Sequence, residues 1–96
     1  MVKITKIYKN DCSPCTEVSK ILSQVKEPFE LEELNIEDSA FKIRKRAKAL
    51  LMKYATSHIP FILFTKADGT EYVAHYQEEG LPTVEIIEDK IKQGLK

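Results

Sequence analysis

The sequence has no tryptophan, only two cysteines and no excess of either charge. Its 15 basic and 15 acidic residues give a formal net charge of +0, so no overall field draws the chain to nucleic acid or to a membrane surface. The amino-terminal residues mix lysine with apolar side chains and contain neither a signal-peptide core nor a membrane-spanning stretch. We therefore expect a cytoplasmic chain without a nucleic-acid or membrane partner.

The chain has 96 residues and contains no internal repeat, linker or low-complexity tract. This length is enough for one domain with a modest hydrophobic core that needs no covalent or metal cross-link to fold. We predict a single domain over residues 1–96 and a monomeric state.

The two cysteines, Cys12 and Cys15, are three positions apart, so their thiols can close on each other across one turn of backbone. They follow an apolar, strand-like run and precede a helical pattern that begins at Pro14. If the motif opens that helix, the free N–H groups of the first turn and the helix dipole both favour the thiolate of Cys12. The pKa of a cysteine in such a position falls from about 8.5 to roughly 3.5–7.5. The pattern predicts a redox site in which Cys12 attacks and the more buried Cys15 resolves.

Two other uses of the cysteine pair stay open at this point. A CxxC pair can form half of a zinc site, but structural zinc needs a second ligand pair, and His58 and His75 do not have the spacing to supply it. The thiols could also be small core residues without a redox role. We expect no metal, and no cofactor besides the redox-active cysteine pair.

Apolar periodicity predicts an α/β fold. Strands are expected over 2–8, 29–36, 61–64 and 71–76. Helices are expected over 14–26, from an acidic, capping-competent segment at 37–39 to about Tyr54, and after a break at Gly80 with Thr83 as its N-cap. Right-handed crossovers would make the first three strands neighbours in a four-stranded mixed sheet, with an antiparallel hairpin at its edge and helices on both faces.

Two charged side chains are expected to point inward. Period-two alternation places Lys6 on the same strand face as Val2 and Ile4, and it places Glu33 on the same face as Leu31. Two side chains of opposite charge are therefore expected to point into the interior.

The second predicted helix carries a basic run, Lys42, Arg44, Lys45, Arg46 and Lys48. The simplest interpretation is a solvated face whose positive charge follows an acidic N-terminus and suits the helix dipole. Contact with an acidic partner is the alternative. Aromatic residues that could stack on bases are not interleaved with these cations, which argues further against nucleic acid.

Nearly the whole chain resembles the thioredoxin family. The resemblance rests on Cys12-Ser13-Pro14-Cys15 after the first strand, Leu34-Asn35-Ile36-Glu37 at the end of the second, Ile59-Pro60 before the third, and a hairpin followed by a terminal helix. It implies a thioredoxin-like fold and a thiol-disulfide oxidoreductase that reduces protein disulfides through a mixed disulfide.

The resemblance also implies which residues border the substrate. In the family the Ile-Pro bond is cis, and its loop lies against the CxxC and pairs its backbone with an extended substrate, roles that fall here to Ile59 and Pro60. Ser13 and Pro14 of the motif are expected to border the substrate as well, and Tyr8 to flank the site.

The family has a buried acid six residues before its first cysteine, paired with a lysine on the next strand. Here the corresponding residues are Lys6 and Glu33, so the charges are exchanged. Our hypothesis is that Glu33, partnered by Lys6, relays a proton to or from Cys15, because a paired carboxylate suits acid/base work. The alternative is an ion pair that only neutralises two buried charges.

The partners implied by the resemblance are protein disulfides as substrates and a reductase or glutathione as electron donor. Glutaredoxins are the nearest rival, because Lys9 matches a basic residue that they use on a glutathione carboxylate, although their paired glycines after the hairpin are missing here. A non-enzymatic interaction module that keeps the fold is the third alternative.

Overall fold

The computed structural model describes residues 1–73 and 81–96. The elements follow one another as β1 (Lys3–Tyr8), α1 (Ser13–Ser23), β2 (Glu30–Asn35), α2 (Phe41–Lys53), β3 (Phe61–Thr65), β4 (Glu71–Val73) and α3 (Val84–Gly94). The predicted order of strands and helices is confirmed. The predicted strand residues 74–76 and the break at Gly80 lie outside the described residues.

The four strands form one mixed sheet in the order β2-β1-β3-β4. β1 runs parallel to β2, with Tyr8 opposite Asn35, and antiparallel to β3, with Ile7 opposite Phe61. The mixed sheet is confirmed. The expectation that a right-handed crossover leads from β2 to a parallel third strand is wrong, because β3 is antiparallel to β1. The connection through α2 instead returns the chain to the edge of the sheet at which β2 ends, so β3 starts there and runs back.

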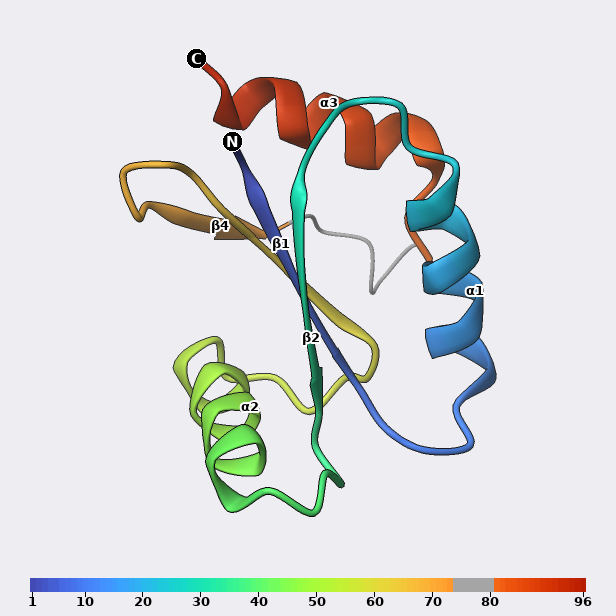
Figure 1. Ribbon diagram of the computed structural model, residues 1–96, viewed down its shortest axis with the longest axis vertical. Coiled ribbons are helices and arrows are strands. Elements are labelled where there is room, and N and C mark those ends of the chain that lie inside the picture. The colour runs from blue at the N-terminus through green and yellow to red at the C-terminus, as the bar shows by residue number, and fades with distance from the viewer. Residues whose placement is uncertain (74–80) are drawn as a thin grey trace.

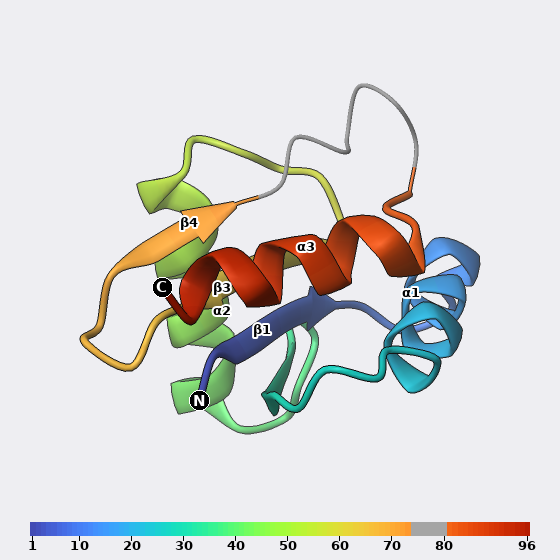
Figure 2. The same ribbon diagram turned by 90° about the horizontal axis from the view of Figure 1, so that it is seen from above.

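Helices cover both faces of the sheet, as predicted (Figures 1 and 2). Because side chains alternate along a strand, each face has its own core. The buried residues of one core, under α1 and α3, are Val2, Ile4, Val18, Leu22, Ile62, Phe64, Ile87 and Ile91. Those of the other core, under α2, are Ile7, Leu34, Ala47, Leu50, Phe61 and Leu63.

α1 ends earlier than predicted, whereas α3 begins as predicted. α1 stops at Ser23, three residues short of the predicted end, and the backbone N–H of Lys26 then donates to a carboxylate oxygen of Glu88 on α3 at 2.8 Å. This contact ties the segment that follows α1 to α3. The N-cap of α3 is confirmed, since Thr83 Oγ1 accepts from the backbone N–H of Ile86 at 3.2 Å.

The start of α2 contradicts the prediction of an acidic, capped N-terminus. The N-cap residue is Ala40, which offers no side-chain acceptor, and the first turn contains no acidic residue. Asp38 Oδ1 instead accepts from the backbone N–H of Ala40 at 2.7 Å. The segment 37–39 therefore forms a turn ahead of the helix, because a local bond from an aspartate to the backbone two residues on competes with helix formation.

The two charged residues that were expected to be buried differ in their exposure. Lys6 lies on the inner strand β1 and is 3% exposed, as predicted. Glu33 and Leu31 lie on β2, where the Glu33 side chain is 45% exposed and Leu31 is 47% exposed. The prediction of a buried Glu33 is wrong because β2 is an edge strand with one side open to solvent. Within residues 1–73 and 81–96 no helix has both the length and the apolar character needed to cross a lipid bilayer.

Candidate redox site

The site forms where β1 ends and α1 begins. The loop 9–11 links the two, and Asp11 has a φ of 52°, a left-handed conformation that aspartate tolerates better than most residues. Cys12 then takes the N-cap position of α1 with extended backbone, and Pro14 lies in the first turn, where its missing N–H leaves no bond unmade. The prediction that the motif opens the helix is confirmed.

Cys12 and Cys15 form a disulfide, with their Cα atoms 5.2 Å apart. Cys12 Sγ also accepts from the backbone N–H of Cys15 at 3.2 Å. The sulfur thus occupies the position in which a serine or aspartate oxygen would cap a helix. After reduction of the disulfide, the same N–H group and the helix dipole would act on a Cys12 thiolate.

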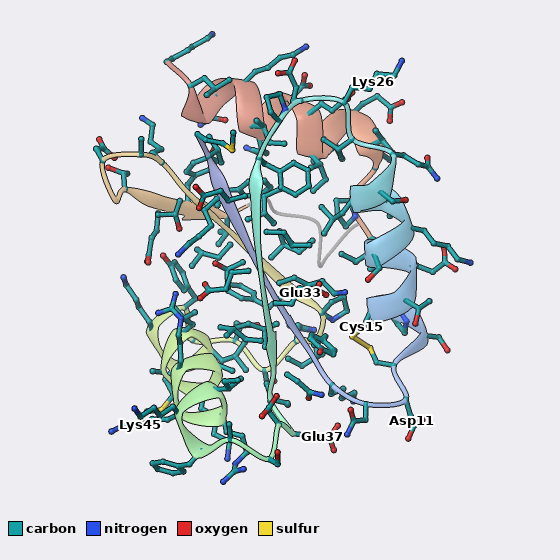
Figure 3. The ribbon with its side chains drawn as sticks, in the orientation of Figure 1. Asp11, Cys15, Lys26, Glu33, Glu37 and Lys45 are labelled. Atoms are coloured by element: carbon teal, nitrogen blue, oxygen red, sulfur yellow. A yellow bond between two sulfur atoms is a disulfide. The ribbon has the colours of Figure 1, made fainter. Side chains whose placement is uncertain are left out.

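The two sulfur-bearing residues have different access to solvent. Cys12 is half-buried, whereas Cys15 is 4% exposed and lies one turn further into α1. Figure 3 shows the disulfide at the lower end of α1, with Cys15 on the side of the helix that faces the sheet. An incoming group would therefore reach Cys12 more easily than Cys15.

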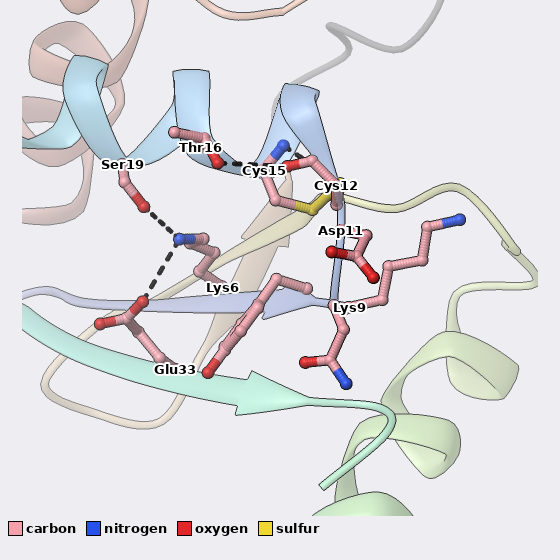
Figure 4. A pocket seen from close by; sticks show the side chains of 10 residues that line it. Lys6, Lys9, Asp11, Cys12, Cys15, Thr16, Ser19 and Glu33 are labelled. Atoms are coloured by element: carbon pink, nitrogen blue, oxygen red, sulfur yellow. Dashed lines mark hydrogen bonds and ion pairs between the residues drawn. A yellow bond between two sulfur atoms is a disulfide. The ribbon is translucent and has the colours of Figure 1, made fainter.

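The disulfide lines a pocket of about 490 Å³ between α1 and the carboxyl ends of β1 and β2 (Figure 4). Five of the predicted site residues lie in this pocket, and they are Lys6, Tyr8, Cys12, Cys15 and Glu33. Further lining residues are Lys9, Asn10, Asp11, Thr16 and Ser19. The pocket is mostly polar, and it carries both signs of charge.

Lys6 makes the central contacts of the pocket. Its ammonium group donates to Ser19 Oγ and lies 3.3 Å from a carboxylate oxygen of Glu33. It also lies 5.0 Å from the centre of the Tyr8 ring. Ser19 was not singled out from the sequence, although it follows Cys15 by four residues and therefore lies on the same side of α1. That spacing was the available signal.

The other predicted substrate-binding residues do not line this pocket, according to its lining among the described residues. Ser13 and Pro14 are exposed on the first turn of α1. The Ile59–Pro60 peptide bond is cis, and Pro60 is buried. Because Phe61 pairs with Ile7, this bond precedes β3 at the sheet edge where β1 ends, which is the edge that carries the disulfide.

In the described part of the chain, two clusters of charged side chains that shift pKa values lie away from this pocket, between α2 and the sheet. Arg46 donates two hydrogen bonds to Glu32 and thereby lowers the pKa of that carboxyl below its usual value. Lys53 and Tyr54 both donate to one oxygen of Glu71, at 2.6 Å each, and lower its pKa. These contacts hold α2 against the sheet and take no part in the redox site.

Among the described residues, no three or more histidine, cysteine, aspartate or glutamate side chains are placed to hold a metal ion. The chemistry that the pocket offers is that of its two sulfur atoms, with a buried ammonium and a half-exposed carboxylate beside them.

No family model and no curated protein matches the sequence. Solved structures do match. Thioredoxin O2 from Arabidopsis thaliana in its oxidized state has a TM-score of 0.62 and 16% identity, over 97% of this chain and 74% of that chain. The first thioredoxin domain of mouse protein disulfide-isomerase A4 has a TM-score of 0.63 and 18% identity, over 99% of this chain and 64% of that chain.

A third match is the C-terminal domain of DsbD from Neisseria meningitidis in its oxidised form, with a TM-score of 0.60 and 14% identity, over 97% of this chain and 79% of that chain. Identities this low establish a common fold and nothing further. The chain therefore has the thioredoxin fold, with a CxxC disulfide at the start of its first helix.

Proposed function

We propose that this protein is a dithiol-disulfide oxidoreductase that reduces disulfides in other proteins. The observation that carries the proposal is the placement of Cys12 Sγ as the N-cap acceptor of α1, 3.2 Å from the backbone nitrogen of Cys15. A helix N-terminus favours the thiolate, and the thiolate is the attacking form of cysteine. The difference in burial between the two cysteines gives each of them a separate step.

In the first step the Cys12 thiolate attacks one sulfur of the substrate disulfide. A bond forms between Cys12 Sγ and that sulfur, the substrate S–S bond breaks, and the other substrate sulfur leaves as a thiolate that takes a proton from solvent. Cys12 carries this step because it is the more accessible of the pair.

In the second step Cys15 loses its proton and attacks Cys12 Sγ. The mixed disulfide breaks, the second substrate sulfur leaves, and the Cys12–Cys15 disulfide forms, so that two electrons have passed to the substrate. We assign the proton of Cys15 to the carboxylate of Glu33, which can pass it to solvent because its side chain is 45% exposed. The ammonium of Lys6 favours the Cys15 thiolate by its positive charge.

A dithiol reductase or glutathione would then return the pair to the reduced state. Glutathione is favoured by one observation, which is that Lys9 lines the pocket beside Cys12, where its ammonium could hold a carboxylate. We further propose that the protein works as a monomer in the cytoplasm, where thiol pools keep such pairs reduced.

The test is reduction of insulin by the wild-type protein, with dithiothreitol or reduced glutathione as electron donor, compared with the variants Cys12→Ser and Cys15→Ser. Cys12→Ser should abolish turnover. Cys15→Ser should accumulate a mixed disulfide that mass spectrometry detects, since the second step is blocked. Turnover with reduced glutathione as the sole electron donor would show that glutathione can return the cysteine pair to the reduced state.

The midpoint potential of the pair, measured in graded thiol/disulfide buffers, gives its direction. A value near roughly −270 mV is that of a reductant, and a value nearer roughly −120 to −180 mV is that of an oxidant or isomerase. If no reversible disulfide forms, or if the double variant Cys12→Ser/Cys15→Ser retains the function of the protein in the cell, the protein is a non-enzymatic interaction module and the proposal is wrong.

A further inference from the structure

One face of α2 carries a groove of about 430 Å³, well away from the disulfide pocket. Its lining residues follow one another at helical spacings of three and four, and they are Lys42, Lys45, Arg46, Ala49, Leu50 and Lys53. The exposed Ala49 and the small accessible edge of Leu50, which is 7% exposed, supply the apolar part of the groove, and the four cationic side chains frame it. We name this surface the α2 groove.

The charges of α2 are unfavourable for the helix itself. Its cations are Lys42, Arg44, Lys45, Arg46, Lys48 and Lys53, and it contains no acidic residue. Like charges at i,i+3 and i,i+4 destabilise a helix, and a cation in the first turn opposes the helix dipole. The acidic N-terminus that would have balanced this charge lies outside the helix, because α2 begins at Phe41. Stability of the helix therefore does not explain the cations in its first two turns.

The sheet neutralises only part of this charge. Arg46 pairs with Glu32 at 2.9 Å, and Lys53 pairs with Glu71 at 2.6 Å. Lys42 and Lys45 make no ion pair or side-chain hydrogen bond within the described residues, and both are exposed. Figure 3 shows Lys45 projecting from α2 away from the sheet. The open end of the groove thus presents two free ammonium groups beside an apolar strip.

We propose that the α2 groove docks an acidic segment of a partner protein, in which carboxylates flank an apolar side chain. The carboxylates would meet Lys42 and Lys45, and the apolar side chain would cover Ala49 and the accessible edge of Leu50. This complementarity is that of a small apolar centre with a charged rim, which is typical of protein recognition sites.

Nucleic acid fits the same surface less well. Single strands bind through aromatic platforms on which bases stack. The exposed aromatic side chain of α2 is Phe41, and the guanidinium of Arg44 already lies 5.8 Å from the centre of its ring. The apolar strip would find no partner on a phosphate backbone.

The α2 groove and the disulfide pocket have no lining residue in common. α2 also lies on the opposite face of the sheet from α1, which carries the cysteines (Figure 1). The docking surface is therefore independent of the proposed redox function, and a bound partner would leave Cys12 accessible.

The test uses the full chain and a fluorescein-labelled synthetic peptide with two glutamates on either side of one leucine. Binding is measured by fluorescence anisotropy at about 150 mM salt. The wild-type protein should bind it saturably below about 1 mM. The charge-reversal variant Lys42→Glu/Lys45→Glu should weaken binding about tenfold or more, because two attractions become repulsions.

The matched control is Lys26→Glu/Lys96→Glu, which changes the net charge equally at two exposed positions outside α2. It should weaken binding less than about twofold, since at this salt concentration the interaction between exposed charges is largely screened beyond about 8 Å. The neutral variant Ala49→Gln tests the groove without a change of charge, and it should weaken binding about threefold by filling the apolar strip.

Several results would overturn the proposal. These are the absence of saturable binding, an equal loss in both charge-reversal variants, and undiminished affinity when serine replaces the leucine of the peptide. Tighter binding of a labelled oligo-dT of equal length, lost in Lys42→Glu/Lys45→Glu, would assign the surface to nucleic acid instead.

Discussion

The ammonium of Lys6 lies 3.3 Å from a carboxylate oxygen of Glu33, yet the two side chains are 4% and 45% exposed. The positive charge is held inside the protein next to α1, and the negative charge is in contact with water. The two members of the pair therefore have different surroundings. Under the proposed mechanism the buried cation acts on the sulfur chemistry and the half-exposed carboxylate exchanges protons with solvent, whereas a purely structural pair does neither.

Replacement of Glu33 by glutamine tests the proton relay. We expect Glu33→Gln to slow the second step of disulfide exchange by about tenfold and to change its pH profile, because the amide cannot accept the Cys15 proton. Stopped-flow decay of a preformed mixed disulfide on Cys12 gives the rate. Glu30→Gln, an exposed carboxylate on the same strand, is the matched control and should leave the rate unchanged. An unaltered rate and pH profile in Glu33→Gln would make the pair purely structural.

Replacement of Lys6 by methionine tests the buried charge. A cation near the sulfur atoms stabilises thiolate and therefore the reduced state, so Lys6→Met should shift the midpoint potential to more negative values. A tenfold change in the equilibrium corresponds to about 30 mV for this couple, and we expect a shift of about that size. Methionine keeps the apolar stem, so the free energy of unfolding should change by less than about 1 kcal/mol. A well-folded variant with an unshifted potential would contradict this role for Lys6.

Ionisation of the Tyr54 hydroxyl should lower the free energy of unfolding in alkaline solution. Burial and the hydrogen bond to Glu71 raise the pKa of Tyr54 to about 12. A raised pKa means that the folded state favours the neutral phenol, so this contribution is complete below the unfolded pKa of about 10 and is lost as pH rises toward 12. At neutral pH, Tyr54→Phe should lower the free energy of unfolding by about 1 kcal/mol.

Guanidinium denaturation of both proteins between pH values of about 8 and 11 measures this effect. The difference between wild type and Tyr54→Phe should narrow as the pH rises above about 10. A difference that stays constant over the whole range would show that ionisation of Tyr54 is not linked to folding.

Ala55 offers a stabilising substitution. It has a φ of 50° and lies in the turn that follows α2. In this turn the N–H of Ala55 donates to Met52 O at 3.1 Å, and the N–H of Thr56 donates to Leu51 O at 3.0 Å. Glycine is preferred in this left-handed position. Ala55→Gly should raise the free energy of unfolding by about 0.5 kcal/mol in denaturant titrations. The control Ala67→Gly, in a turn without positive φ, should lower it by a similar amount, and equal effects of both changes would refute the argument.

Residues whose role depends on local sequence were predictable. The position of Cys12 as the start of α1 followed from a strand, a loop and a proline at fixed offsets, and the cap at Thr83 followed from its place before an apolar helical pattern. The burial of Lys6 followed from alternation along β1, which lies between two other strands. In each case the neighbours in sequence are also the neighbours in space.

The exposure of Glu33, the direction of β3 and the start of α2 were not predicted. The alternation of β2 placed Glu33 inward, but alternation does not tell an edge strand from a central one. The antiparallel direction of β3 depends on the path of the whole connection through α2, and the left-handed conformation of Ala55 at the end of that helix is not predictable from an alanine. The predicted start of α2 was wrong because the side chain of Asp38 accepts a hydrogen bond from the backbone N–H of Ala40, which lies ahead of the helix.

The sequence by itself determined the cysteine pair, its place at the start of a helix, and the alternating strands and helices of an α/β domain. These depend on backbone geometry and on periodicity over a few residues. Only the tertiary structure decided that Lys6 also meets Ser19 beside the disulfide, that its partner Glu33 is half-exposed, and that the cations of α2 surround an open groove. Those outcomes depend on which segments pack together and which edges stay open to water, and a one-dimensional pattern does not contain that information.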